Sequence, residues 1–229
     1  KGKKKSARSR FLIFLFKSAV VLTCLVFFFV FSVYLGLFGP IPTKATLSRV
    51  KNNSATLVYS HDHRMVGKYF LQNRMTIGEE NISQYAKDAL VATEDSRFFR
   101  HRGLDVRSLA RVFVKTIVLG DRSQGGGSTI SQQLARNLYH RSDYGKFTLP
   151  INKVREIFIS ARLEKVYSKD EVLALYLNTV PFGDNTYGIE VASQRFFGKA
   201  SAQLNPAEAA TIVGMLAANT AYNPRVNPE

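Results

Sequence analysis

The sequence predicts a mainly α-helical domain that follows one membrane-spanning helix and a short β-hairpin region. Residues 18–39 (SAVVLTCLVFFFVFSVYLGLFG) carry no charge. As a helix this run would be about 33 Å long, enough to cross the hydrocarbon core of a bilayer. Two β-like runs surround a polar turn near residue 62, and from about residue 81 apolar residues recur at helical spacing. The 229 residues leave room for one ordinary domain and an appendage.

The N-terminal segment combines positive charge with the apolar run. Residues 1–17 hold seven Lys and Arg residues and no acidic residue. Because a Lys/Arg excess before a span keeps that end in the cytoplasm, we expect a cytoplasmic basic tail at 1–17 and export of everything after the span. A cleaved signal peptide is the alternative. Its apolar stretch would be only about 7–15 residues and would end at a small-residue cleavage site, whereas Pro40 follows here.

The overall composition narrows the function classes. The net charge is +15, and the one cysteine, Cys24, lies inside the predicted span. This excludes a disulfide framework, a thiolate metal site and a cysteine nucleophile from the exported part. A basic balance fits nucleic acid, a membrane surface or an acidic substrate, and nucleic acid is disfavoured because the basic cluster adjoins a membrane span. The chain starts with Lys and ends without a closing element, which favours a fragment of a longer protein.

The exported part is expected to begin with a linker and short β region at 40–80. Residues 40–54 are polar with two prolines, and strands at 55–60 and 65–70 form a hairpin. His61 and His63 at its turn have no further ligands nearby in the sequence, so we interpret them as a solvated turn rather than a metal site.

Helices are expected after residue 81. The first runs from there to a stop at Gly103. The second covers 105–119, with a basic face opposite an apolar one, and suits either the membrane surface or the core. The later helices have start or stop signals: Ser128 or Thr129 as a cap, Pro150 before a helix to Val166, the capping box Ser168–Glu171 before a helix to Asn178, a stop at Gly198, and Asn205-Pro206 with Glu208 before a helix to about Ala218.

Three stretches offer groups for chemistry. In VATEDSRFFRHRG (91–103), Glu94 and Asp95 follow an apolar run. GGGSTISQQLARNLY (125–139) lacks the Lys-Ser/Thr of a nucleotide P-loop, but its helix start would favour an anion. PINKVREIFISARLEK (150–165) crowds charges at a helix start. Two carboxylates with cations suit a sugar transfer from a phosphate leaving group, or a glycosidase, and spacing alone does not separate these.

These stretches resemble the motifs of the peptidoglycan glycosyltransferases (glycosyltransferase family 51). ATEDSRFFRHRG is similar to the first motif, E-D-x-x-F-x-x-H-x-G, and GGSTISQQLARNLY to the second, G-G-S-T-x-x-Q-Q. NKVRE stands in the place of the third, R-K-x-x-E. SKDEVLALYLNTVPFGDNTYGIEVASQRFFGK and LNPAEAATIVGMLAANTAYNP resemble the fourth and fifth. The motifs come in family order over about 85–224, so the resemblance implies a lysozyme-like glycosyltransferase domain at 81–229, beside the membrane.

The resemblance also implies an activity. The expected reaction polymerises lipid II into β-1,4-linked glycan strands and releases undecaprenyl pyrophosphate, with inversion. Glu94 is the implied general base, Asp95 its support and Glu156 the second carboxylate. The implied contacts to the donor sugar and pyrophosphate are Ser128, Thr129, Gln132, Gln133, Arg136, Asn137, Lys153 and Arg155. A divalent cation (Mg²⁺ or Mn²⁺) is implied near the pyrophosphate, without a certain protein ligand and without an organic cofactor.

The implied partners are lipid II, the nascent glycan strand, the membrane and a C-terminal transpeptidase domain in the full-length protein. The expected location is the inner (cytoplasmic) membrane, single-pass, with the catalytic domain periplasmic or extracellular. One residue departs from the pattern, because Asn152 stands where the third motif has Arg. Arg155, three residues later on the same helix face, is predicted to supply the missing cation.

Two alternatives remain at this point. A lysozyme-like peptidoglycan hydrolase or lytic transglycosylase would use one carboxylic acid to cleave glycan. The Gly-Gly-Ser-Thr block and the cationic third motif argue against it, because cleavage has no pyrophosphate to hold. A membrane-anchored binding or scaffold protein with an inactive site is the other alternative, because of Asn152.

Overall fold

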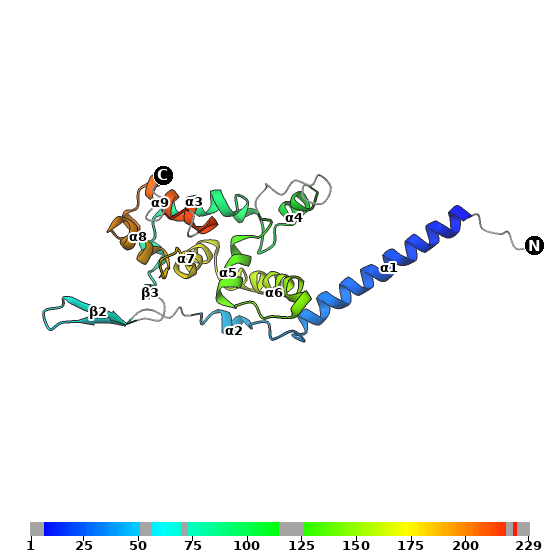
Figure 1. Ribbon diagram of the computed structural model, residues 1–229, viewed down its shortest axis with the longest axis horizontal. Helices are drawn as coiled ribbons and strands as arrows, with labels where there is room; N and C mark the ends of the chain where they lie inside the picture. The colour runs from blue at the N-terminus through cyan, green and yellow to red at the C-terminus, as the bar shows by residue number, and fades with distance from the viewer. Residues whose placement is uncertain (1–6, 51–55, 70–72, 115–125, 219–221, 224–229) are drawn as a thin grey trace, which may run out of the picture.

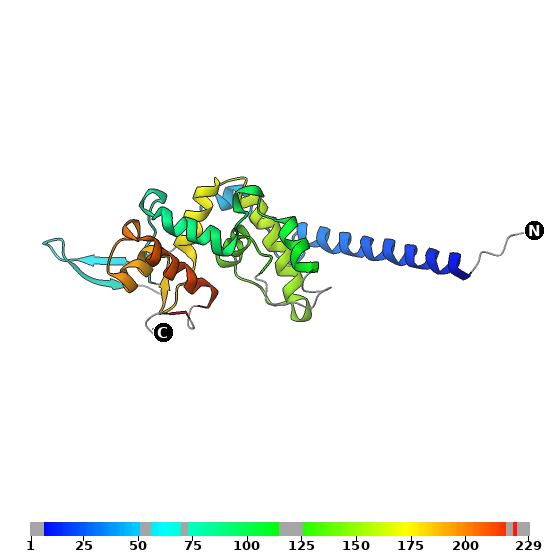
Figure 2. The ribbon, with the colours of Figure 1, turned by 90° about the horizontal axis from the view of Figure 1, so that it is seen from above.

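The computed structural model describes residues 7–50, 56–69, 73–114, 126–218 and 222–223. A long helix, α1 (Ala7–Tyr34), extends from a helical body, and a β-hairpin projects from the opposite end of that body (Figures 1 and 2). Helices make up most of the body, which confirms the predicted mainly α fold class.

Helix α1 contains most of the predicted span. Its segment Arg8–Tyr34 is apolar and long enough to cross a membrane, and its most apolar stretch of 18 residues has no buried residue, whereas Ser32 and Val33 near its end are buried. The helix begins at Ala7, within the predicted basic tail, and ends at Tyr34 rather than residue 39. It ends there because Gly36 and Gly39 take positive φ values of 82° and 96° in the turns that follow. The helical span is therefore displaced toward the N-terminus from the predicted 18–39.

The described part of the predicted linker at 40–54, residues 40–50, is packed against the body, and residues 51–54 lie outside the described residues. A short helix, α2 (Lys44–Leu47), lies there, and Leu47 is fully buried. Arg162 donates hydrogen bonds to the carbonyl oxygens of Ile41 (3.0 Å) and Pro42 (2.9 Å). This segment lies against helix α6 (Thr148–Leu163), and Tyr34 at the end of α1 packs on Phe158 of the same helix, with ring centroids 5.3 Å apart.

The predicted hairpin is confirmed. Strand β1 (Thr56–Tyr59) pairs antiparallel with β2 (Met65–Tyr69), and the register shifts between Val58 and Tyr59. His61 and His63 are exposed at the turn, as expected. A second, parallel pair, β3 (Asn73–Arg74) with β4 (Thr186–Tyr187), was not predicted, because two residues are too few to show an alternating pattern.

The first helix of the body is much shorter than predicted. After the 3-10 turn η1 (Glu79–Asn81), helix α3 covers Gln84–Glu94 and stops there, so the predicted stop at Gly103 is wrong. Asp95 leaves the helix with φ −156°, and the chain continues through η2 (Phe98–Arg100), where Phe98 is fully buried. Glu94 is therefore the last residue of α3 and lies at its C-terminal end rather than in the middle of a helix.

The later helices follow their capping signals. Asp105 caps α4 (Val106–Phe113), and the predicted residues 115–119 of this helix lie outside the described residues. Thr129 caps α5, Ser168 and Glu171 form the predicted capping box of α7, Gly198 ends α8 with φ +69°, and Asn205 with Glu208 caps α9. The bounds are α5 (Ile130–Leu138), η4 (Gly145–Phe147), α7 (Lys169–Thr179), α8 (Ile189–Phe197), η5 (Ser201–Gln203), α9 (Pro206–Gly214) and η6 (Met215–Ala217). Helix α6 ends at Leu163, three residues before the predicted Val166.

The core lies where these helices meet. Helix α3 packs against α9, and α5 packs against both α6 and α7 and lies between them in Figure 1. The largest fully buried side chains of this core include Tyr176, Phe98 and Phe182. This packing brings the C-terminal end of α3 beside the N-terminal end of α5, and the candidate active site lies at that junction.

Candidate active site

A cavity of about 580 Å³ lies where α3 ends and α5 begins. Its wall is formed by the end of α3, by α4, by the segment that enters α5 and by η6. The polar side chains of the wall are Thr93, Glu94, Asp95, Ser96, Asp105, Ser108, Arg111, Ser128, Thr129, Gln133 and Arg136. The first two motifs of the sequence, whose residues Glu94 and Gln133 are 39 positions apart, therefore share one cavity.

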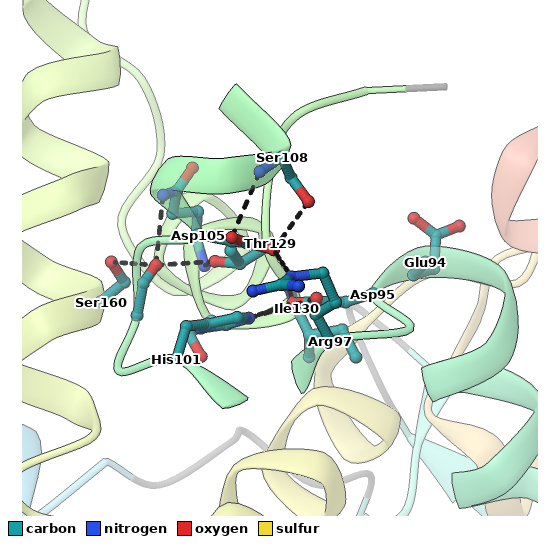
Figure 3. A network of polar contacts seen from close by, with 12 residues as sticks. Glu94, Asp95, Arg97, His101, Asp105, Ser108, Thr129, Ile130 and Ser160 are labelled. Carbon is teal, nitrogen blue, oxygen red and sulfur yellow. Dashed lines mark hydrogen bonds and ion pairs between the residues drawn. The ribbon is translucent and has the colours of Figure 1, made fainter. Parts of the chain in front are cut away.

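Glu94 has one engaged and one free carboxylate oxygen. Gln133 donates from Nε2 to Oε2 of Glu94 at 2.7 Å. Among the hydrogen bonds and ion pairs of the described residues, Oε1 has no partner. Figure 3 shows the Glu94 carboxylate pointing away from the polar network that surrounds Asp95. One oxygen is therefore available to a molecule in the cavity.

Asp95 instead joins two elements of the protein. Its Oδ2 accepts a hydrogen bond from the backbone N–H of Ile130 (3.2 Å) and lies 3.0 Å from Nε2 of His101. Both side chains of the Asp95–His101 pair are nearly buried. Asp95 thus binds an N–H at the start of α5 that has no partner within the helix, and it fixes α5 to the end of α3. These contacts fit the predicted supporting role of Asp95 beside Glu94, which stays a prediction.

The carbonyl oxygen of Gly103 fixes the loop after η2. It accepts from Thr129 Oγ1 (2.8 Å), Gln132 Nε2 (3.1 Å) and Ser160 Oγ (3.3 Å) (Figure 3). Gln132 is 1% exposed and its amide is engaged by this carbonyl, so its predicted substrate contact stays a prediction. Thr129 lines the cavity but acts as the cap of α5, since its Oγ1 also accepts from the N–H of Gln132.

Asp105 holds the wall formed by α4. Its carboxylate accepts from the N–H groups of Arg107 and Ser108, from the Ser108 hydroxyl (2.7 Å) and from Nε of Arg97 (2.8 Å). Burial alone would raise the pKa of Asp105, but the hydrogen bonds from Ser108 and the charge and hydrogen bond of Arg97 outweigh it and lower the pKa to about 2. Both oxygens are engaged, so Asp105 is a structural anion.

Three cations, Lys153, Arg136 and Arg141, form a cation cluster beside the same cavity. Lys153 Nζ donates to Ser128 Oγ at 2.7 Å. Burial lowers the pKa of Lys153, and the nearby charges of Arg141 and Arg136 lower it further, against the opposing effect of Glu156. A bound anion would relieve both the burial of the ammonium and the repulsion between these cations. The cluster of Lys153, Arg136 and Arg141, next to the N-terminus of α5, therefore suits a phosphate group.

Glu156 belongs to this cluster and is not a free second carboxylate. Its Oε1 accepts from Arg141 Nε at 2.8 Å, and Lys153 Nζ lies 3.4 Å from its Oε2. Glu156 is 5% exposed. These contacts orient Arg141 and Lys153, and the catalytic role that the resemblance implies for Glu156 stays a prediction.

Arg141 takes the place that we predicted for Arg155. Arg155 instead lies beside Gly39 at the end of the α1 segment, with Nη1 3.4 Å from the Tyr144 hydroxyl. Asn152, the departure from the third motif, is 2% exposed and donates to the carbonyl oxygens of Ser142 (2.8 Å) and Thr148 (2.7 Å). It thereby fixes the loop that carries Arg141. No sequence pattern indicates this exchange, because Arg141 is 15 residues from Glu156.

Asn137 and Tyr176 differ from what the sequence predicts for them. Asn137 is half-buried on α5 and is outside the cavity lining of the described residues. Tyr176, which sequence reasoning missed, is buried on α7 and donates its hydroxyl to Gln133 Oε1 at 2.9 Å. Its apolar neighbours in the sequence indicate a core residue only.

The described residues do not offer a ready metal site. Within those parts of the chain, no group of three or more His, Cys, Asp or Glu side chains lies close enough together to hold an ion. The carboxylates nearest the cation cluster are already paired with cations or N–H groups. The predicted Mg²⁺ or Mn²⁺ ion therefore stays a prediction.

Comparison with known proteins gives a consistent result. The family model described as Transglycosylase matches residues 62–229. Penicillin-binding protein 1A of Neisseria gonorrhoeae is 36% identical over 219 residues, which is 92% of this chain and 27% of that protein. Penicillin-binding protein 1A of Pseudomonas aeruginosa is 36% identical over 96% of this chain, and that of Escherichia coli K12 is 37% identical over 80%. The chain spans about a quarter of the length of these relatives.

Proposed function

This chain belongs to the transglycosylase family of peptidoglycan glycosyltransferases, and we propose that it polymerises lipid II into β-1,4-linked glycan strands and releases undecaprenyl pyrophosphate. One observation carries the proposal. A carboxylate with one free oxygen, Glu94, lines the same cavity as Arg136 and Ser128, and Ser128 is bonded to Lys153. This arrangement supports a base at one end of a reaction and cations for an anionic leaving group at the other.

The proposed step is a single displacement. Oε1 of Glu94 takes the proton from the 4-hydroxyl of the acceptor sugar, and the hydroxyl oxygen forms a bond to the anomeric carbon of the growing chain. The bond from that carbon to the pyrophosphate oxygen breaks on the opposite face, so the configuration inverts. The electron pair leaves with the pyrophosphate, whose charge the cation cluster stabilises. A positioned general base typically contributes about 10²–10⁴-fold to such a rate.

The engagement of the other carboxylates argues against a two-carboxylate glycosidase, and the cation cluster argues against a lytic transglycosylase with one acid, which has no pyrophosphate to hold. A glycosidase of the usual type needs two carboxyl groups that flank the scissile bond. Asp95 and Asp105 both have their oxygens engaged by protein groups, and Glu156 is paired with Arg141 and Lys153. This leaves Glu94 as the one carboxylate of the described cavity wall with an oxygen free for a substrate.

The membrane helix supports a lipid-linked substrate. Helix α1 is the single candidate span among the described residues, and its end packs on α6, the helix that carries Lys153. We propose that the N-terminus is cytoplasmic, because of its Lys/Arg excess, and that the cavity lies on the outer side. The relatives are about four times as long as this chain, so we also propose that the whole protein carries a further domain, a transpeptidase.

The test is polymerisation by the detergent-solubilised protein. Wild type is expected to convert labelled lipid II into long glycan, and Glu94→Gln is expected to lower the rate at least about 100-fold. Glu80→Gln, at an exposed carboxylate on η1, is the matched control and should keep the wild-type rate. Shortening of pre-made glycan would instead identify a hydrolase. No change to either substrate would identify a binding or scaffold protein.

A further inference from the structure

Three side chains from three helices form a chain of hydrogen bonds that ends at the proposed base. Tyr176 on α7 donates its hydroxyl to Gln133 Oε1 at 2.9 Å, and Gln133 on α5 donates from Nε2 to Glu94 on α3 at 2.7 Å. Tyr176 is 2% exposed, whereas Gln133 and Glu94 line the cavity. The buried phenol thus reaches the cavity through one amide.

The direction of this chain follows from the chemistry of its members. An ionised carboxylate only accepts hydrogen bonds, so the NH₂ end of the Gln133 amide must face Glu94. The carbonyl end then faces Tyr176, which must donate its proton. Burial, and then the nearby negative charge of Glu94, raise the pKa of Tyr176 above its ordinary value of 10.0, so the phenol keeps that proton at physiological pH. The ionised carboxylate sets the orientation of the amide, and the protonated Tyr176 completes it by donating to the carbonyl end.

We propose that Tyr176 is a positioning residue for the general base, acting through Gln133 to occupy Oε2 of Glu94 and leave Oε1 to take the acceptor's proton. This inference rests on the proposed function and adds a residue outside the motifs' expected substrate contacts. It also gives Gln133 a second task besides the predicted contact to the donor. The phenol holds the other end of the amide and so keeps the Gln133 side chain at the carboxylate.

Removal of the Tyr176 hydroxyl releases the carbonyl end of the Gln133 amide. Without that tether the Gln133 side chain can move away from Oε2 of Glu94 into other rotamers. The charged form of Glu94 would lose a hydrogen bond that favours it, so base catalysis should weaken most at acidic pH. The other charged groups of the cavity stay as they are: Asp95, Asp105, Arg111 and Arg136.

The experiment compares Tyr176→Phe with Tyr167→Phe in the lipid II polymerisation assay as a function of pH. Tyr176→Phe should lower kcat/KM about 3- to 10-fold near neutral pH, in line with the loss of one hydrogen bond between neutral groups. The acidic limb of its rate profile should move to higher pH, and KM should change little. Tyr167 is the matched control, since its hydroxyl donates to the Leu47 carbonyl at 2.7 Å, outside the cavity lining. Tyr167→Phe should keep the wild-type profile.

A second variant keeps the test decisive if Tyr176→Phe does not fold. Gln133→Met removes the amide from a half-buried position and should move the acidic limb in the same direction. Adding Tyr176→Phe to Gln133→Met should change the rate no further. An unmoved limb in either folded single variant, or strictly additive losses in the double variant, would overturn the inference. If wild type makes no glycan, or Glu94→Gln keeps the full rate, the proposed function fails instead.

Discussion

Substitution of Gly103 by Ala should destabilise the protein through a specific contact with helix α6. Gly103 has φ +81°, and a Cβ atom there would lie 2.9 Å from Ala161 N and 2.9 Å from Ser160 C. A side chain in this left-handed region costs roughly 1–2 kcal/mol. Both contacted atoms are backbone atoms within α6, so relief of the contact requires movement of the loop or helix, at about 1–3 kcal/mol. We therefore expect a loss of about 2–5 kcal/mol in the free energy of unfolding.

Gly145→Ala separates the two contributions. Gly145 also has a positive φ, +59°, but a Cβ atom there would have no neighbour within 4 Å among the described residues, so only the backbone cost of roughly 1–2 kcal/mol should appear. Urea unfolding at fixed detergent concentration, followed by circular dichroism, measures both variants. Gly103→Ala should also slow polymerisation, because the displaced Gly103 carbonyl holds Thr129 and Gln132 at the start of α5. Equal destabilisation by the two substitutions would refute the proposed contact with α6.

Further expected outcomes concern the cations, an anion and a helix cap. Arg141→Ala should raise KM for lipid II about 10-fold, as loss of one charged hydrogen-bond donor would, whereas Arg155→Ala should leave KM unchanged; the reverse ranking would restore Arg155 as the missing cation. The pKa of Lys153 is lowered, so Lys153 should lose its charge at a lower pH than an ordinary lysine. The affinity of the wild-type enzyme for lipid II should therefore fall as pH rises through that range, whereas Lys153→Arg should keep its affinity there. Asp105 has a folded pKa of about 2 against 3.8, so its stabilisation is present above pH 3.8 and is lost as pH falls toward 2; Asp105→Asn should reduce the acid dependence of Tm in that window. Ser168→Ala removes one half of a capping box and should lower stability by about 1 kcal/mol in the same urea assay.

The features that the sequence predicted well depend on neighbouring residues. The hairpin, the capping boxes of α7 and α9 and the left-handed Gly198 all arise from contacts within a few positions. The end of α3, in contrast, depends on a residue far away in the sequence. Its helical pattern continues past residue 94, but Asp95 leaves the helix and its carboxylate binds the N–H of Ile130, 35 residues later. Only the tertiary structure supplies that partner, so the predicted stop fell nine residues too late.

The sequence predicted that cations gather near Glu156, but it did not predict every residue of the cation cluster. The resemblance to the family selected Lys153, Arg136 and Glu156, which the structure places together. It could not select Arg141, because that residue comes from a loop whose position depends on the buried amide of Asn152. In this chain, Asn152 therefore replaces the charge of the motif's Arg with a structural contact, and a different Arg restores the charge beside Glu156.

The second motif has a geometric explanation that bears on every assignment within it. Successive residues of an α-helix point about 100° apart, so two adjacent side chains cannot contact the same partner. Gln132 turns into the protein and donates to Gly103, while Gln133 turns to Glu94 and Tyr176. The adjacent glutamines thus fix the two sides of the α3–α5 junction: one anchors the loop after η2, and the other orients the base. Arg136, one turn further on, and Ser128 before the cap also line the cavity, and their contacts with substrate stay predictions. The Gln-Gln pattern is therefore explained by contacts that hold the proposed base in place as well as by the predicted contacts with substrate.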